Sequence, residues 1–144
     1  MARKTYDTWA GCPLRFSAAA LGDRWTFLIL RDIIFKGHRR YRDFLNGEEG
    51  IATNVLANRL ADLERHGIVE RKPDPKHSAR SLYFLTAKGR DLVPAMLELI
   101  VWAERHDPQT EVPKPFGDRA RADPRGFADE LVDDILKRDA TYLD

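Results

Sequence analysis

The stretch IATNVLANRLADLERHG, residues 51–67, shows the clearest periodicity in the chain. Its leucines at positions 56, 60 and 63 follow one another at spacings of four and three, so they share one face of a helix. The opposite face is polar, and Gly67 is a common type of residue at the end of a helix. The sequence therefore predicts an amphipathic helix over residues 52–66, with one face buried and the other in solvent.

The residues before this stretch predict three more helices. The first spans residues 13–21 and begins with a proline, which is common in the first turn of a helix. Asp23 can cap the second helix, over residues 24–35, which is apolar nearly all round and should be the buried centre of the domain. A short third helix over residues 40–45 is followed by a turn at residues 46–50.

A β-hairpin is predicted directly after the 52–66 helix. Residues 68–71 and 82–85 have the composition of two short strands. The loop between them, residues 72–80, is rich in proline and positive charge. The chain thus has two short helices separated by a glycine turn, followed by a hairpin with a basic tip. This is the order of elements in a winged helix-turn-helix.

The remaining residues predict two further helices with a linker between them. The first begins after its cap Thr86, runs to about residue 105 and should kink at Pro94. Its apolar residues cover more of its circumference than one domain surface needs. Residues 108–124 resemble a linker, and Asp123 can cap a final amphipathic helix.

The predicted fold class is mainly α with a small β-hairpin (α+β). We expect a winged helix-turn-helix domain at residues 11–106 with extra N- and C-terminal dimerisation helices. Residues 107–144 should form a linker and an amphipathic helix, either in the same folding unit or as an extension of the dimer interface. At 144 residues the chain is long enough for one stable core without disulfides or metal.

Charge is distributed unevenly along the chain. The whole chain has a formal net charge of +1. Residues 31–90 hold 13 Lys or Arg and 8 Asp or Glu, whereas residues 91–144 hold 7 and 13. A basic middle attracts phosphate backbones and an acidic tail does not. An ordinary solvated surface explains the charges alone equally well.

Several classes of protein are disfavoured. No stretch reaches the roughly 18 consecutive apolar residues that a membrane crossing needs, and residues 1–10 lack the apolar run of a secretory leader. We therefore expect a cytoplasmic protein with no membrane partner. The four histidines have no spacing suited to a metal site, and no glycine-rich phosphate loop or Ser–His–acid set stands out. The sequence predicts neither an enzyme nor a bound metal or cofactor.

The N-terminal half of the 52–66 helix carries residue types that read DNA bases. Asparagine can pair with adenine, threonine can donate to a base or a phosphate, and a small alanine permits close approach. The candidate contacts on this helix are Thr53, Asn54, Ala57, Asn58 and Arg59. A polar face that is merely solvated is the alternative, and the order of the elements favours the reading helix.

Two basic clusters flank this helix in the sequence. The tip of the hairpin would reach the minor groove or nearby phosphates through Lys76, His77 and Arg80. The start of the 40–45 helix would contact phosphates through Arg39, Arg40 and Arg42. Some of these arginines would instead pair with acidic neighbours.

Several motifs together resemble the HxlR-type family of bacterial, MarR-like regulators. They are GCP at 11–13, GDRWTFLILRD at 22–32, RRYRDF at 39–44, EGIATNVLANRLADLE at 49–64 and LTAKGRDL at 85–92, followed by Pro94 and Trp102. They occur in the right order with matching gaps over about residues 11–106. The resemblance implies a winged-helix domain and a dimer built from the first helix and the 86–105 helix. The candidate dimer contacts are Leu14, Met96, Leu99, Ile100 and Trp102.

Two single residues take their meaning from this resemblance. Cys12 matches an N-terminal cysteine that some members use to sense oxidants or electrophiles, and a thiol at a helix N-terminus is stabilised as a thiolate. A small structural hydrophobe is the alternative. Family members often carry serine where this chain has Ala52, so Thr53 would take over a capping or phosphate-binding role.

The function expected from the sequence is that of a DNA-binding transcriptional regulator. It would bind a near-palindromic operator in double-stranded DNA as a homodimer, with a small-molecule effector or a redox signal as its input. The alternative keeps the fold as a protein–protein adaptor without sequence-specific DNA binding. An adaptor would favour apolar or aromatic residues on the exposed face of the 52–66 helix, where this chain has asparagines.

Overall fold

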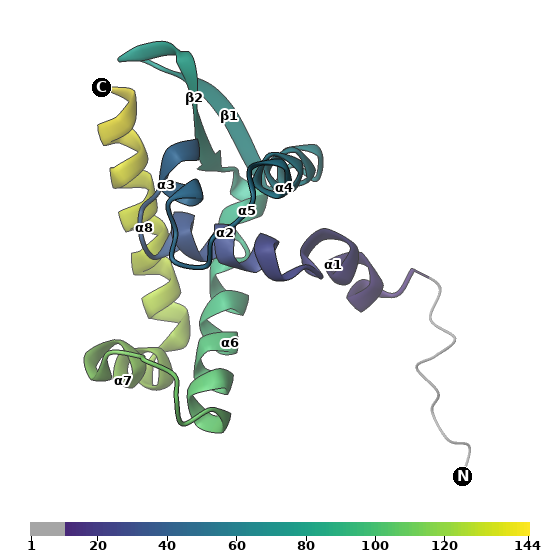
Figure 1. Cartoon of the computed structure of the whole chain (residues 1–144). Helices are drawn as coiled ribbons and strands as arrows, with labels where there is room; N and C mark the ends of the chain where they lie inside the picture. Colours follow the sequence, from purple (N-terminus) through teal and green to yellow (C-terminus); the bar gives the residue numbers. More distant parts are fainter. Residues whose placement is uncertain (1–10) are drawn as a thin grey trace.

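The computed structural model describes residues 11–144 (Figure 1). Residues 1–10, on which the expectation about a secretory leader rests, lie outside the described residues. The elements in chain order are α1 (Pro13–Leu21), α2 (Arg24–Ile34), α3 (Tyr41–Leu45), α4 (Thr53–Arg65), β1 (Val69–Asp74), β2 (His77–Leu85), α5 (Ala87–Arg90), α6 (Val93–His106), α7 (Lys114–Ala122) and α8 (Pro124–Leu143). The predicted mainly helical fold with one small hairpin, a winged helix-turn-helix, is confirmed.

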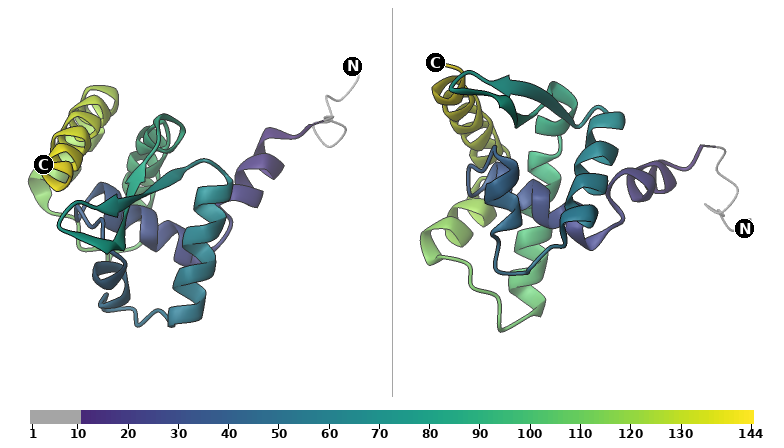
Figure 2. Two further views of the ribbon diagram at one scale, coloured as in Figure 1. Left: turned by 90° about the horizontal axis from the view of Figure 1, so that it is seen from above. Right: turned by 45° about the horizontal axis from the view of Figure 1, so that its top comes forward.

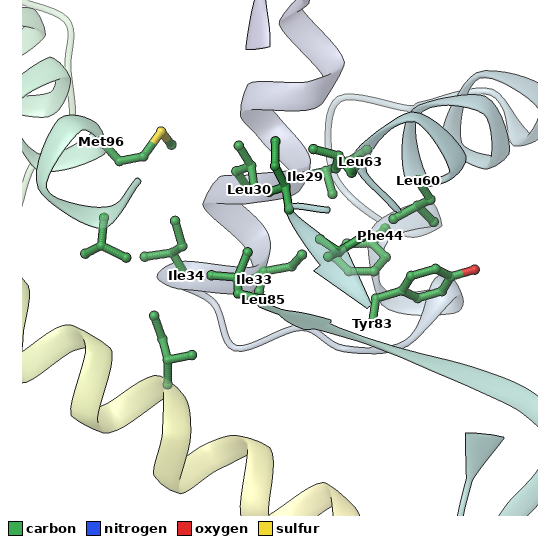
Figure 3. Packing of buried hydrophobic residues seen from close by; sticks show 14 of the residues in the cluster. Ile29, Leu30, Ile33, Ile34, Phe44, Leu60, Leu63, Tyr83, Leu85 and Met96 are labelled. Atoms are coloured by element: carbon green, nitrogen blue, oxygen red, sulfur yellow. The ribbon is translucent and has the colours of Figure 1, made fainter. Parts of the chain in front are cut away.

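Helix α2 lies at the centre of the core (Figure 3). Leu30 and Ile33 on this helix are fully buried. The core around them receives the leucine stripe of α4, apolar residues of β2 and the first turns of α6. Burial of each such leucine or isoleucine contributes about 1.5–3 kcal/mol, so this packing fixes the position of α4 against α2.

Local signals at the ends of these helices act as the sequence predicts. Asp23 caps α2 by accepting hydrogen bonds from the backbone N–H groups of Trp25 and Thr26. Helix α4 ends before Gly67, whose φ of 70° is the left-handed conformation that favours glycine. The chain can therefore turn sharply from α4 into the hairpin.

The hairpin is longer than predicted. The expected loop at residues 72–80 is partly strand, because β1 and β2 form an antiparallel ladder from the pair Val69–Leu85 to the pair Asp74–His77, with residues 78–80 unpaired where the register shifts between Pro73 and Asp74. Only Pro75 and Lys76 remain between the strands, and Asp74 accepts a hydrogen bond from the backbone N–H of Lys76 across this turn. A side-chain bond of this kind stabilises a tight turn that the two prolines make hard to recognise in the sequence.

Two predictions for the C-terminal half are wrong. The expected helix over 86–105 is divided into α5 and α6, because Pro94 lies in the first turn of α6 instead of kinking one long helix. The expected linker contains α7, where Pro115 also lies in a first turn. Phe116 on α7 then packs edge-on against Phe35, at the C-cap of α2, and Phe127 of α8.

Helix α8 connects the C-terminal segment to the rest of the molecule. Its cap is Asp123, as predicted, which accepts a hydrogen bond from the backbone N–H of Gly126. Ala128 and Ile135 on α8 are buried in the same core as α2. The C-terminal end of α8 lies beside the hairpin (Figures 1 and 2), where the ring of Tyr142 stacks with the guanidinium of Arg40.

An ion pair holds the turn before α4 on α2. The guanidinium of Arg31 donates two hydrogen bonds to the carboxylate of Glu49, at 2.5 and 3.2 Å. This bonding lowers the pKa of Glu49 from its ordinary 4.5 to about 2. The turn that presents α4 is therefore stabilised while Glu49 is ionised.

We expect this pair to make the stability of the fold depend on acid pH. The folded pKa is lower than the unfolded one, so the contribution of Glu49 is complete above pH 4.5 and is lost as the pH falls towards 2. Chemical unfolding between pH 6 and 2.5 measures it, and Glu49→Gln should flatten the curve in this range. Glu48→Gln, at the exposed neighbouring residue, should leave the curve unchanged. Parallel curves for all three proteins would refute the assignment.

Candidate nucleic-acid interface

The polar face of α4 is open to solvent. Its leucine stripe faces the core, so the first two turns expose the side chains of Thr53, Asn54, Ala57 and Asn58. The hydroxyl of Tyr41 on α3 donates a hydrogen bond to the carbonyl of Thr53 at 3.0 Å and fixes the start of α4 on the preceding helix. The start of α4 is thus fixed against α3 while its polar face stays open to solvent.

The start of α4 has no side-chain cap. Helix α4 begins at Thr53, and Ala52 occupies the cap position without a side-chain hydrogen bond. The expectation that Thr53 takes over the capping role is wrong, because Thr53 is already inside the helix. The uncapped backbone N–H groups of this first turn, together with the positive end of the helix dipole, are suited to a phosphate group.

Arg59 is held by a partner that the sequence analysis did not identify. Its Nε donates a hydrogen bond to the Asp23 carboxylate at 2.8 Å, so one carboxylate both caps α2 and ties α4 to it. The Arg59 hydrogen bond lowers the pKa of Asp23. Because 36 residues separate this pair, neither cap rules nor helix periodicity could have identified it.

The wing and the start of α3 form one basic groove of about 570 Å³. Its basic lining side chains are Arg40, Arg42, Lys76, His77 and Arg80. Asp43 is the single acidic residue among those that line it. We call this surface the wing groove; it brings together five of the six wing and phosphate candidates. Tyr41 and Ser81, which the sequence analysis did not select, also line it.

Arg40 is the most constrained cation of the wing groove. Its Nε lies 3.7 Å from the Asp74 carboxylate. The backbone N–H of Lys76 and, to a smaller extent, the Arg40 charge lower the pKa of Asp74. The turn of the wing and the start of α3 are thereby linked through one buried carboxylate.

Arg39 is not a phosphate contact, contrary to the prediction. Its side chain is fully buried, with Nε donating to the Asp139 carboxylate at 2.7 Å and Nη1 donating to the carbonyls of Ile33 and His38. Burial raises the pKa of Asp139, although the Arg39 guanidinium opposes this. The sequence shows only a run of positive residues here, because the burying acid lies 100 positions further on.

The candidate dimer residues fall into two groups. Leu14, Leu99 and Trp102 are exposed, at 77%, 47% and 61% of their surface. Met96 is buried in the core of its own chain, which does not fit a dimer contact, whereas Ile100 is half-buried and its role in a dimer stays a prediction. The helical spacing of apolar residues shows that α6 has two apolar sides, but does not show which side meets α8.

Helix α1 projects from the body of the molecule (Figures 1 and 2). None of its residues is buried, and Phe16, which was not among the candidates, is 66% exposed beside Leu14. Cys12 occupies the cap position of this helix and is half-buried. The thiol and the exposed apolar residues of α1 thus lie on one element.

Residues 11–144 contain neither a metal-binding cluster nor a membrane-spanning helix. No group of three or more His, Cys, Asp or Glu side chains in that part is arranged to hold a metal ion. Over the same residues, no helix combines the length and apolar composition that spanning a membrane requires.

The order of elements, the exposed face of α4 and the wing groove define a transcriptional regulator of the winged helix-turn-helix class. The chain belongs to the HxlR-like helix-turn-helix family, whose profile matches residues 20–111. The resemblance found in the sequence is therefore confirmed.

Three relatives illustrate this membership. Rv3095 of Mycobacterium tuberculosis, an HTH-type transcriptional regulator, is 36% identical over 126 residues, which cover 84% of this chain and 78% of the relative. The crystal structure of PA1607 superposes with a TM-score of 0.65 at 34% identity, over 76% of each chain. The reduced form of the regulator YodB from Bacillus subtilis gives 0.56 at 32% identity, over 71% of this chain and all of that one. YodB has also been solved quinone-bound and diamide-treated.

Proposed function

We propose that this chain binds double-stranded DNA sequence-specifically, as a homodimer on a near-palindromic operator, and that a small-molecule or redox signal changes its operator affinity. Helix α4 reads bases in the major groove through Asn54 and Asn58. The wing groove contacts phosphates or the minor groove. We place this activity in the cytoplasm, as the composition of the chain leads us to expect.

One observation carries the proposal: Tyr41 belongs to both parts of the surface. Its side chain lines the wing groove, and its hydroxyl bonds the first residue of α4. The exposed asparagines of α4 and the cations of the wing groove are therefore neighbours on one continuous surface. Such an arrangement combines base contacts that specify with charge contacts that position.

The exposed apolar residues support the homodimer. Leu14 and Phe16 on α1 and Trp102 on α6 expose most of their surface to water. A second copy would cover these side chains through the same surfaces, as in a two-fold dimer. Two linked reading helices would then match the two halves of a palindromic site.

Base reading and phosphate contact can be separated by two substitutions. Asn54→Ala should weaken binding to the selected operator about 5- to 100-fold and leave non-specific binding unchanged, because it removes a base contact. Arg80→Ala should weaken binding to all sequences alike and lower the salt slope by about one. Fluorescence anisotropy on an operator selected from random DNA measures both, with Gln109→Ala, an exposed amide beyond α6, as control. Equal loss on both kinds of DNA for Asn54→Ala would exclude it from base reading.

The redox part of the proposal rests on Cys12 and on the quinone-bound and diamide-treated forms of YodB. We expect a quinone or diamide to lower operator affinity in the natural protein by at least tenfold, because modification at the cap of α1 alters a helix of the dimer. Cys12→Ser should bind the operator normally and not respond. If both proteins respond alike, the redox proposal is refuted and Cys12 is a structural residue. The same conclusion follows if neither protein responds although mass spectrometry shows that Cys12 is modified.

A further inference from the structure

A second hollow lies on another part of the molecule. It is a cavity of about 730 Å³ between the C-terminal end of α2, the segment before α7, and helices α7 and α8. Its apolar lining comes from Ile34, Phe35, Ile100, Phe116, Phe127 and Leu131. The volume lies within the range of small-molecule sites, about 300–1,000 Å³. Much of its wall belongs to residues beyond 111, outside the segment that the family profile matches.

The cavity wall contains one unsatisfied polar atom. Arg39 lines the cavity and is fully buried. Its Nε and Nη1 have partners, but Nη2 has no hydrogen-bond partner among residues 11–144. A buried donor left without a partner costs about 1–3 kcal/mol. The atom is covered in this structure, and an acceptor on a bound molecule that reached it would recover this cost.

The other charged residues of the lining are Arg31, two further cations and two acids. Arg31 is already paired with Glu49. Lys36 Nζ lies 3.9 Å from the Asp32 carboxylate, and Arg138 donates only a long hydrogen bond, 3.4 Å, to the carbonyl of Lys36. Two cations thus retain bonding capacity. The lining also contains two acids, Glu111 and Asp134, which would repel a second negative group on the same ligand.

We propose that this cavity binds an amphipathic monocarboxylic acid, with the carboxylate on Arg39 Nη2 and the hydrocarbon or aryl body among the apolar side chains. The acid is the small-molecule effector, and this consequence rests on the proposed function in DNA binding. Binding of the acid in the cavity affects the proposed DNA-binding surface through the backbone. The carbonyl of Arg39 accepts a hydrogen bond from Tyr83 N of the wing at 2.8 Å, and the next residue, Arg40, lines the wing groove.

Calorimetric titration of the full chain with decanoate and with 1-naphthoate tests the binding. We expect saturable binding of at least one acid, and at least tenfold weaker binding of the matching alcohol, decanol or naphthalenemethanol. Leu131→Trp fills the cavity and should weaken binding at least tenfold, whereas Leu136→Trp on the exposed side of α8 should not. Val112→Trp, in the segment before α7, provides a second filling variant if Leu131→Trp does not fold.

Three results would overturn the proposal: no saturable binding of either acid, equal binding of acid and alcohol, or unchanged binding in the filled variants. Operator anisotropy without any acid tests DNA binding separately. Acid binding without operator binding would refute the proposed function and leave the cavity site intact. Operator binding that saturating acid changes less than threefold would refute the role as effector.

Discussion

Asp139→Ala should lower the free energy of unfolding by roughly 3–5 kcal/mol, because it leaves the charge of the buried Arg39 without its carboxylate. Urea unfolding of the full chain measures the loss. Asp133→Ala, at an exposed aspartate on the same helix, is the control and should change stability by less than about 0.5 kcal/mol.

A double variant checks that the charge, and not the lost volume, causes the effect. Arg39→Met combined with Asp139→Leu removes both charges and keeps apolar bulk, so it should be more stable than Asp139→Ala alone. If Asp139→Ala costs less than about 1 kcal/mol, the pair does not hold α8 on the winged-helix domain. A double variant that is no more stable than Asp139→Ala would assign the loss to packing.

Leu14→Glu should reduce operator affinity at least 100-fold without unfolding the chain. The side chain is 77% exposed in the single chain, so a charge there costs little stability but must be buried when a second copy covers α1. Loss of the dimer removes the gain from linking two half-site contacts, which is typically 10²- to 10⁴-fold. Sedimentation equilibrium should show a monomer, and anisotropy on the full operator should show the loss.

The control for this experiment is Leu136→Glu, which places the same charge on the exposed face of α8. It should remain dimeric and bind the operator like the natural protein. The homodimer proposal would be refuted by a monomeric Leu14→Glu that still binds the full operator tightly. A natural protein that is monomeric at micromolar concentration and binds the operator equally well would refute it too.

The parts of the fold that could be predicted are those fixed by local signals. The leucine stripe of α4, the cap Asp23 and the terminal Gly67 are properties of neighbouring residues, so they located the central helices well. The same holds for the exposed asparagines of α4, because a helix with one buried face must expose the other.

The parts that could not be predicted depend on distant partners. From the sequence, Arg39 is interpreted as a surface cation. In the structure, the C-terminal helix places Asp139 beside it. From the sequence, Met96 is interpreted as part of an intermolecular apolar face, whereas the structure buries it in the core of its own chain. The prolines around α7 suggest a linker, and only the packing of Phe116 on two other aromatic rings shows why a helix forms there.

Helix α1 has a consequence for how the protein responds to its own abundance. An isolated helix of nine residues is marginal in water, and α1 fully buries none of its side chains in its own chain, where Ala20 and Leu21 near its C-terminal end pack partly against the core. A partner copy would supply the contacts that stabilise α1 as a helix. Dilution should therefore separate the two copies and melt α1 together, so helicity would fall as the protein becomes scarce. Occupancy of a palindromic site would then rise with roughly the square of the free chain concentration, and the cell's expression level would itself act as a threshold.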